Sequence, residues 1–330
     1  MNRSFRWSGL PWRWVLGGTV LAAVLWRTGA GPFVTGLRSL DAPTLALAAG
    51  ITVPTTVACA WRWHLVARGL GVDIGMRSAV AAYYRAQFLN TVLPGGVLGD
   101  VHRGVLHGRV AGDTGRGLRA VAWERFAGQV VFLVLAALVL VLLPSPVRPV
   151  LPTVVALLSA ALLAGLLVSR RPRGPRSSWV RRVLRAVHDD VRFGLLVRRS
   201  WPAVVLASTV AVVGHVATYV VAARAVGVTA PLVVLLPLAV LVLVAAGLPL
   251  NLAGWGPREG TAAWAFAAAG LGAGQGVATA VAYGVLVLAA NLPGAAVLLV
   301  SSAHAGHRRD LGPAQTRRPA HLVGGGRSGG

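Results

Sequence analysis

A polar, glycine-rich break interrupts an apolar stretch between residues 84 and 109, which reads YRAQFLNTVLPGGVLGDVHRGVLHGR. The break begins at Pro94, and Asp100 and Arg103 follow it. Pro lacks a backbone donor and Gly resists helix, so the break exposes backbone groups that need partners in protein or in a water-filled cavity. Half-helices lining a cavity are where transporters place binding sites. The alternative interpretation is a cytoplasmic loop between two spans.

A second break of similar composition lies between residues 248 and 260, LPLNLAGWGPREG. Each break holds an Asn, a Pro, several glycines, an acid and an Arg. Two such elements in the two halves of a membrane chain are the pattern expected of duplicated discontinuous helices; the alternative is that each is a Gly/Pro loop at a helix end. The residues that we expect to bind substrate are Asn90, Pro94, Gly95, Gly96, Gly99, Asp100 and Arg103 in the first break, Glu124 and Arg125 between the breaks, and Asn251, Gly254, Gly256, Arg258 and Glu259 in the second.

These side chains suit the phosphate of a lipid. A hydrated cavity with cationic side chains and helix dipoles lowers the cost of moving a phosphate through hydrocarbon. The candidate phosphate ligands are Arg103, Arg125 and Arg258. The acids expected to hold these arginines or to take up protons are Asp100, Glu124 and Glu259. If the two breaks meet across one cavity, we expect Arg258 to pair with Asp100 or Glu124, and Glu259 with Arg103 or Arg125. The neutral hydrogen-bonding candidates are Gln87, Asn90 and Asn251. For Glu124 and Arg125 the alternative is an interfacial pair that only anchors a helix end.

Composition restricts the protein class. The 330 residues are 55% hydrophobic and 12% charged, whereas about a quarter of the residues in soluble domains are charged, so a polytopic membrane protein is expected. There is no Lys, which excludes a Walker A loop and Schiff-base chemistry. With the single Cys59 and scattered histidines we expect no metal site and no cofactor. The net charge of +23 lies on arginines between apolar spans, which indicates anionic lipid headgroups as partners rather than nucleic acid.

Apolar runs predict an all-α bundle of about eight transmembrane helices with two re-entrant or broken elements related as a possible repeat. The predicted spans are residues 12–26, 43–61, 118–143, 150–168, 201–223, 231–248 and 277–300. A re-entrant half-helix is predicted at 78–93, and a short apolar helix, which crosses or is re-entrant, at 264–271. The second span closes on Trp61-Arg62-Trp63-His64, an aromatic and basic signature of the membrane interface.

The loops predict the topology. Residues 169–200 carry ten arginines among apolar residues at helical spacing, which predicts a basic amphipathic helix on an anionic leaflet. We expect one transmembrane domain over residues 1–302 and a disordered Arg/Gly-rich tail over residues 303–330. The positive-inside rule places both termini in the cytoplasm. Both ends of the first break are then cytoplasmic. The break therefore either stays in the cytoplasm or enters the membrane and returns to the same side.

Three segments resemble a known family. FLNTVLPGGVLGDVHRG, AVAWERFAG and LPLNLAGWGPREG, in that order, are similar to the transmembrane region of lysylphosphatidylglycerol synthases, and the similarity extends over residues 11–302. The resemblance implies an integral membrane module of about eight helices with re-entrant segments that moves lipids between leaflets. The aminoacyltransferase domain that some members carry is not implied here. Val97-Leu98 depart from the usual run of glycines, and Trp255 and Pro257 flank Gly256 where smaller or aliphatic residues are usual.

We therefore expect a flippase-like protein of the cytoplasmic membrane that moves an anionic phospholipid or a lipid-linked substrate of the polyprenyl-phosphate type. No catalytic residue is expected. With no nucleotide site, uphill transport would need an ion gradient or a partner. One alternative is a membrane enzyme acting on a lipid-linked substrate, for which Asp100 with His102 is the nearest acid/base candidate. The other is a non-transporting accessory subunit of a cell-envelope lipid or glycan pathway, and a separate enzyme of such a pathway is a possible partner.

Overall fold

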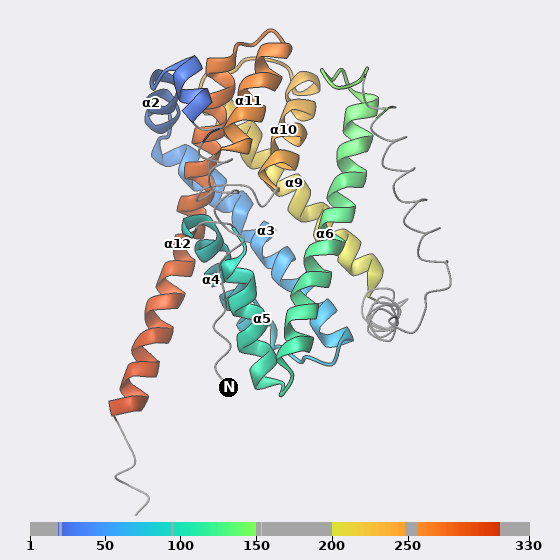
Figure 1. Cartoon of the computed structure of the whole chain (residues 1–330), viewed down its shortest axis with the longest axis vertical. Helices are drawn as coiled ribbons and strands as arrows, with labels where there is room; N and C mark the ends of the chain where they lie inside the picture. Colours follow the sequence, from blue (N-terminus) through green and yellow to red (C-terminus); the bar gives the residue numbers. More distant parts are fainter. Residues whose placement is uncertain are drawn as a thin grey trace, which may run out of the picture.

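The computed structural model describes residues 19, 22–93, 96–149, 153, 200–247 and 256–310, with side chains as far as residue 300. The described part is an all-α bundle, as predicted (Figure 1). Its helices are α2 (Gly31–Arg38), α3 (Ala42–Gly69), α4 (Met76–Val92), α5 (Leu98–Val110), α6 (Thr114–Leu142), α9 (Trp201–Ala225), α10 (Leu232–Ala246), α11 (Pro257–Ala268) and α12 (Ala273–Asp310).

Four of these helices are long and apolar enough to cross a membrane: Ala42–Gly69, Thr114–Leu142, Trp201–Ala225 and Ala273–Val300. They match four predicted spans, with ends that differ by a few residues except for α3, which continues eight residues beyond the predicted end. The predicted span 150–168 and the linker 169–200 lie outside the described residues. Of the predicted span 12–26, residues 22–26 are described and helical.

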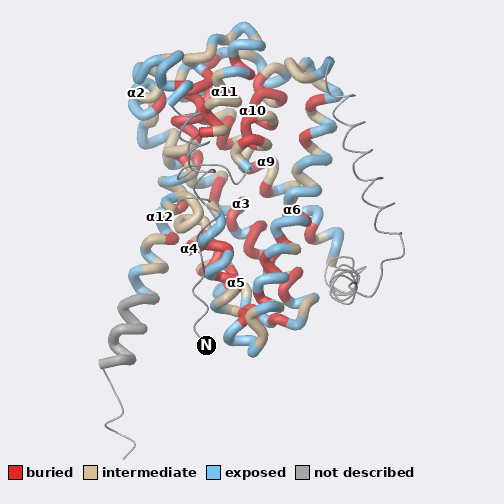
Figure 2. The backbone as a smooth tube through the Cα atoms, in the orientation of Figure 1, coloured by how far each residue is buried: buried red, intermediate tan, exposed pale blue. Residues whose placement is uncertain are grey.

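The helices α3 and α9 form the antiparallel centre of the bundle. Thr55 packs where a side chain on Gly214 would stand, and Arg62 bonds Ser208 one to two turns further along. The absent side chain at Gly214 lets the two backbones approach. Two buried clusters adjoin this pair. One lies among α9, α10, α11 and α12, and the other among α3, α4 and α6 (Figure 2).

The helices α4 and α5 form a hairpin that enters the bundle and returns to the same end (Figure 1). Ser78 and His107 meet near its base at 3.5 Å, and Asn90 bonds the backbone N–H of Gly99 near its tip. Thr91 accepts a hydrogen bond from Asn291, which lies inside the apolar part of α12. The first broken element is therefore re-entrant, because its tip lies at the depth of a membrane-spanning segment.

The helices α10 and α11 form a second hairpin that enters from the opposite end. Along α12, Gly276 packs on Ala262 and Gly284 on Arg258, whereas the tip of the first hairpin reaches Asn291. The two tips are therefore about 10 Å apart along α12, at 1.5 Å per residue. The tips are closer still along α6. Arg125 pairs with Asp100 of the first hairpin, and Gln129 lies against Gly247 of the second. Arg125 and Gln129 are about 6 Å apart along the helix axis.

The two halves thus have inverted topology. The order span, hairpin, span recurs as α3, α4–α5, α6 and as α9, α10–α11, α12, with the hairpins entering from opposite ends (Figure 1). This is the arrangement of inverted structural repeats, whose substrate sites lie near the midplane where the repeats meet.

Two further boundaries differ from prediction. The helix α12 continues to Asp310, eight residues into the segment 303–330 that we expected to be disordered. No Pro follows Pro293 in the sequence before Pro313, and the remainder of the predicted tail lies outside the described residues. The helix α11 begins seven residues before the predicted short apolar helix, because Pro257 stands at its first turn, where a missing N–H costs no hydrogen bond.

Candidate lipid site

Five charged side chains on α3, α5 and α6 form a continuous chain of ion pairs. We call this set the charge network; in order, its members are Arg62, Glu124, Arg103, Asp100 and Arg125. Glu124 accepts from Nε of Arg62 at 2.9 Å on one oxygen and from Nη2 of Arg103 at 2.6 Å on the other. Asp100 accepts from Nε of Arg103 at 2.9 Å and pairs with Nη2 of Arg125 at 2.6 Å. Because positive and negative side chains alternate along the network, the free-energy cost of burying these charges in a low-dielectric interior is lower.

Arg103 is enclosed at the centre of the network. It is fully buried, and its guanidinium carbon lies 4.5 Å from the ring centre of Trp63 and 4.6 Å from that of Tyr83. Aromatic faces stabilise a desolvated cation through the ring quadrupole. Arg103 was expected to bind phosphate, but the structure places it between two acids and two rings, away from any described pocket.

Asn90 holds the tip of the first hairpin. Its Nδ2 donates to Asp100 at 3.0 Å and its Oδ1 accepts from the N–H of Gly99 at 2.8 Å. A Cβ at Gly99 would stand 2.1 Å from the carbonyl oxygen of Ala86, so only glycine allows α5 to begin this close to α4. Gly96 has a φ of 63°, in the left-handed region. The predicted Pro94 and Gly95 lie outside the described residues.

The second hairpin carries its own buried ion pair at the start of α11. Glu259 accepts from Nε and Nη2 of Arg258 at 2.9 and 2.6 Å, and its other oxygen accepts from the N–H of Gly256 at 2.7 Å. Gly256 has a φ of 119°, a value that residues with a side chain rarely adopt. The guanidinium of Arg258 lies 5.7 Å from the ring centre of Tyr283. The predicted Asn251 and Gly254 lie outside the described residues.

The ion pairs that we expected between the two breaks are not those observed among the described residues. Arg258 was expected near Asp100 or Glu124, and Glu259 near Arg103 or Arg125. Instead, each acid pairs with arginines of its own half. The reason is local: Arg258 and Glu259 are adjacent on the first turn of α11, and the acids of the first half are already shared by three arginines.

The aromatic and basic signature at residues 61–64 was interpreted wrongly as a membrane interface. Arg62 and Trp63 are 6% and 1% exposed. The helix α3 continues to Gly69, so these residues lie within the bundle, where Arg62 faces Glu124 and Ser208. An Arg inside a long apolar run was the available signal, since such residues usually face a partner or a cavity. Glu124, fully buried, is likewise more than an interfacial anchor.

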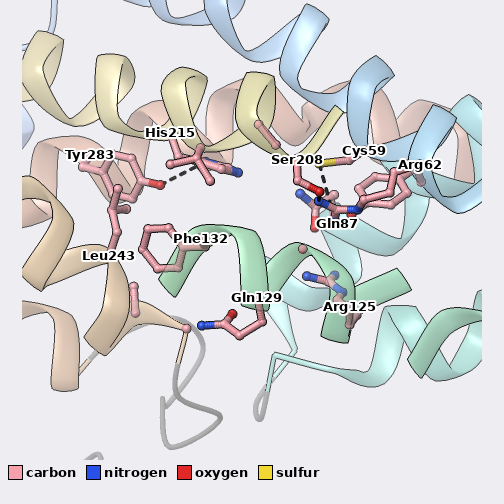
Figure 3. A pocket seen from close by; sticks show the side chains of 16 residues that line it. Cys59, Arg62, Gln87, Arg125, Gln129, Phe132, Ser208, His215, Leu243 and Tyr283 are labelled. Atoms are coloured by element: carbon pink, nitrogen blue, oxygen red, sulfur yellow. Dashed lines mark hydrogen bonds between the residues drawn. The ribbon is translucent and has the colours of Figure 1, made fainter. Parts of the chain in front are cut away.

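A pocket of about 290 Å³ lies where the two halves meet (Figure 3). We call it the central pocket. Its polar lining residues are Arg62, Gln87, Arg125, Gln129, Ser208, His215, Tyr83 and Tyr283. Arg62, Gln87 and Arg125 lie toward one end, and His215 with Tyr283 toward the other (Figure 3). Both hairpins contribute, through Tyr83 and Gln87 of α4 and through Leu243, Ala246 and Gly247 at the end of α10.

The predicted site residues divide into three groups. The first group, Arg125 and Gln87, lines the central pocket. The second lies behind the pocket lining, with Gly96 in the loop before α5, and consists of Asn90, Gly99, Asp100, Arg103 and Glu124. The third is at the start of α11 beside Tyr283 and consists of Gly256, Arg258 and Glu259. Among the polar lining residues, the sequence analysis missed Arg62, Tyr83, Gln129, Ser208, His215 and Tyr283. Apart from Arg62, none of these is an acid or an arginine, so no charge or spacing pattern marked them.

The family model described as "Lysylphosphatidylglycerol synthase TM region" matches residues 14–294. No curated protein and no solved structure matches the chain.

Proposed function

Because this chain belongs to the family of the lysylphosphatidylglycerol synthase transmembrane region, as its motifs indicated, we propose that it moves an anionic lipid between the two leaflets of the cytoplasmic membrane. The lipid is a phospholipid or carries a polyprenyl phosphate. The protein acts as a transporter rather than an enzyme, and both of its termini lie in the cytoplasm. A separate enzyme of a lipid or glycolipid pathway is its proposed partner.

The observation that carries the proposal is a cationic pocket at the depth of the hairpin tips. Arg62 and Arg125 line it, and the side chain of Arg125 is 43% exposed. Ionisable side chains at membrane depth are costly and commonly mark substrate pathways. A guanidinium presents a planar fork of donors that matches phosphate. We assign the phosphate to these two arginines.

The rest of the charge network positions the two arginines. Glu124 fixes Arg62, and Asp100 fixes Arg125. Asn90 in turn fixes Asp100 from the hairpin tip. Each pocket arginine is thereby held in position before a lipid binds, which lowers the entropy cost of ordering its side chain on binding.

The inverted hairpins support a route to either leaflet. The first hairpin enters the bundle from one end and the second from the other (Figure 1), and both line the central pocket through α4 and α10. Movement of one hairpin at a time would open the pocket alternately to the two sides, as in transporters built from inverted repeats. With no energy source identified, the proposed activity is equilibration of lipid between leaflets.

Reconstitution in liposomes tests the proposal. An anionic phospholipid with a fluorophore on one acyl chain is followed by quenching from outside. Arg125→Ala should slow the transfer at least tenfold. The variant should still fold, because Asp100 retains its hydrogen bonds with Arg103 and Asn90. Arg125→Lys should restore part of the rate, since it keeps the charge but loses the fork. The control is Arg116→Ala, a surface arginine on the same helix. Equal transfer by wild type and Arg125→Ala would contradict the proposal.

A further inference from the structure

The charges that line the central pocket bear on which lipid headgroup it binds. We infer that it accepts lipids whose anionic headgroup carries uncharged hydroxyl groups and rejects lipids whose headgroup carries an ammonium group. This rests on the proposed function and deepens it. Aminoacylated lipids such as lysylphosphatidylglycerol would then be poor substrates, and phosphatidylglycerol a good one.

The first argument is the charge of the lining. Among the described residues, two arginines and no carboxylate line the pocket. The two nearest acids in the charge network, Asp100 and Glu124, each already hold two arginines. Three arginines against two acids leave the network with one positive charge. An ammonium group entering here would meet like charges at low dielectric, where repulsion is strong.

The second argument is the location of the other acids. Glu259 is fully buried under Arg258 and the N–H of Gly256. Asp41 and Asp113 cap the first turns of α3 and α6, at helix ends. The stretches 94–95 and 248–255, which complete the two breaks, contain no acid in the sequence. The acids within the two breaks are therefore Asp100 and Glu259, and both already pair with arginines instead of facing an ammonium group.

The third argument is the neutral end of the pocket. The hydroxyl of Tyr283 and Nδ1 of His215 are 3.3 Å apart (Figure 3). Ser208, which bonds Arg62, and His215 are both on α9, about 10 Å apart along its axis. A headgroup that binds at both ends must extend beyond its phosphate. The neutral groups at the far end donate and accept hydrogen bonds, which suits hydroxyls.

The fourth argument is size. At about 290 Å³ the pocket lies just below the range of roughly 300–1,000 Å³ for small-molecule sites. A phosphate with a short polyol fits such a volume, and an oligosaccharide does not. Among the anionic lipids of the proposed function, the pocket therefore favours a phospholipid over a glycan carrier.

Selectivity is tested in liposomes with three lipids labelled on an acyl chain, so that the headgroups stay intact. These are phosphatidylglycerol, phosphatidic acid and lysylphosphatidylglycerol. Wild-type protein should move phosphatidylglycerol at least tenfold faster than lysylphosphatidylglycerol. Equal rates for these two would overturn the inference and leave the proposed function standing.

Two variants separate the ends of the pocket. Tyr283→Phe removes one hydroxyl and should slow phosphatidylglycerol more than phosphatidic acid, which has no hydroxylated group beyond its phosphate. Gln129→Glu adds a carboxylate to the lining and should raise the rate for lysylphosphatidylglycerol relative to phosphatidylglycerol. Equal slowing of both anionic lipids by Tyr283→Phe, or an unchanged ratio in Gln129→Glu, would overturn the assignment of that end.

Binding provides a measurement that does not depend on transport. Short-chain forms of phosphatidylglycerol and lysylphosphatidylglycerol are titrated into the detergent-solubilised protein. At least tenfold tighter binding of phosphatidylglycerol would support the inference. If no lipid moved in liposomes while this difference in binding remained, the proposed function would be wrong but the inferred specificity of the pocket would stand. Equal binding of the two lipids would overturn the inference.

Discussion

Glu124 is the residue on which the charge network depends most. Its two oxygens pair with Arg62 and Arg103, and it has no exposed surface. Removing one partner from a buried ion pair leaves the other charge uncompensated, at a cost of about 3–5 kcal/mol. Glu124→Gln keeps the shape and removes the charge. We expect it to lower the unfolding free energy by about that amount, measured by denaturation of the purified protein in detergent.

An exposed ion pair on the same helix is the matched control. Arg116 and Asp113 are 3.4 Å apart, with side chains 44% and 41% exposed. Because water screens such pairs, Arg116→Ala should change stability by no more than about 1 kcal/mol. If Glu124→Gln is no more harmful than Arg116→Ala, the network is not a stabilising core of the bundle.

At the scale of the element, the first hairpin depends on the close approach of α4 and α5 at Gly99. A Cβ there would overlap the backbone of Ala86, which cannot rotate away. We expect Gly99→Ala to lower the unfolding free energy by about 1–3 kcal/mol, the usual cost of overpacking. It should also slow lipid transfer, because Asp100 follows directly.

Gly50 serves as the control, since a Cβ at this position in α3 would meet nothing within 4 Å. Gly50→Ala should be neutral or stabilising by up to about 1 kcal/mol, from helix propensity. Thermal unfolding in detergent compares the two variants with wild type. Similar midpoints for both would show that α4 and α5 tolerate a wider spacing.

The sequence was sufficient to predict the elements but not their partners. Long apolar runs located α3, α6, α9 and α12, and Pro and Gly located both breaks. The pairing of Arg62 with Glu124 could not be predicted, because residue spacing says nothing about which helices touch. Trp61-Arg62-Trp63 also matches an interface pattern, and only the continuation of α3 shows that Arg62 is inside. His215 and Tyr283 each lie alone in apolar segments, so only the packing of α9 against α12 brings them together.

At the scale of the whole molecule, the inverted arrangement determines which loops share a side. The turn between α5 and α6 lies at the base of the first hairpin, and the turn between α9 and α10 at the base of the second (Figure 1). An inverted repeat places these two turns on opposite sides of the membrane. By the positive-inside rule, the arginines near the first turn predict that it faces the cytoplasm.

Single cysteines test this topology. In a Cys59→Ala background, Ala111→Cys marks the first turn and Thr229→Cys the second, and both positions are exposed. A thiol reagent that cannot cross membranes should label Thr229→Cys in intact cells and both variants after permeabilisation. Labelling only Ala111→Cys in intact cells would reverse the orientation but keep the hairpins on opposite sides. Labelling of both in intact cells would place the hairpin bases on one side. The inverted repeat, and with it the alternating access to the central pocket, would then be wrong.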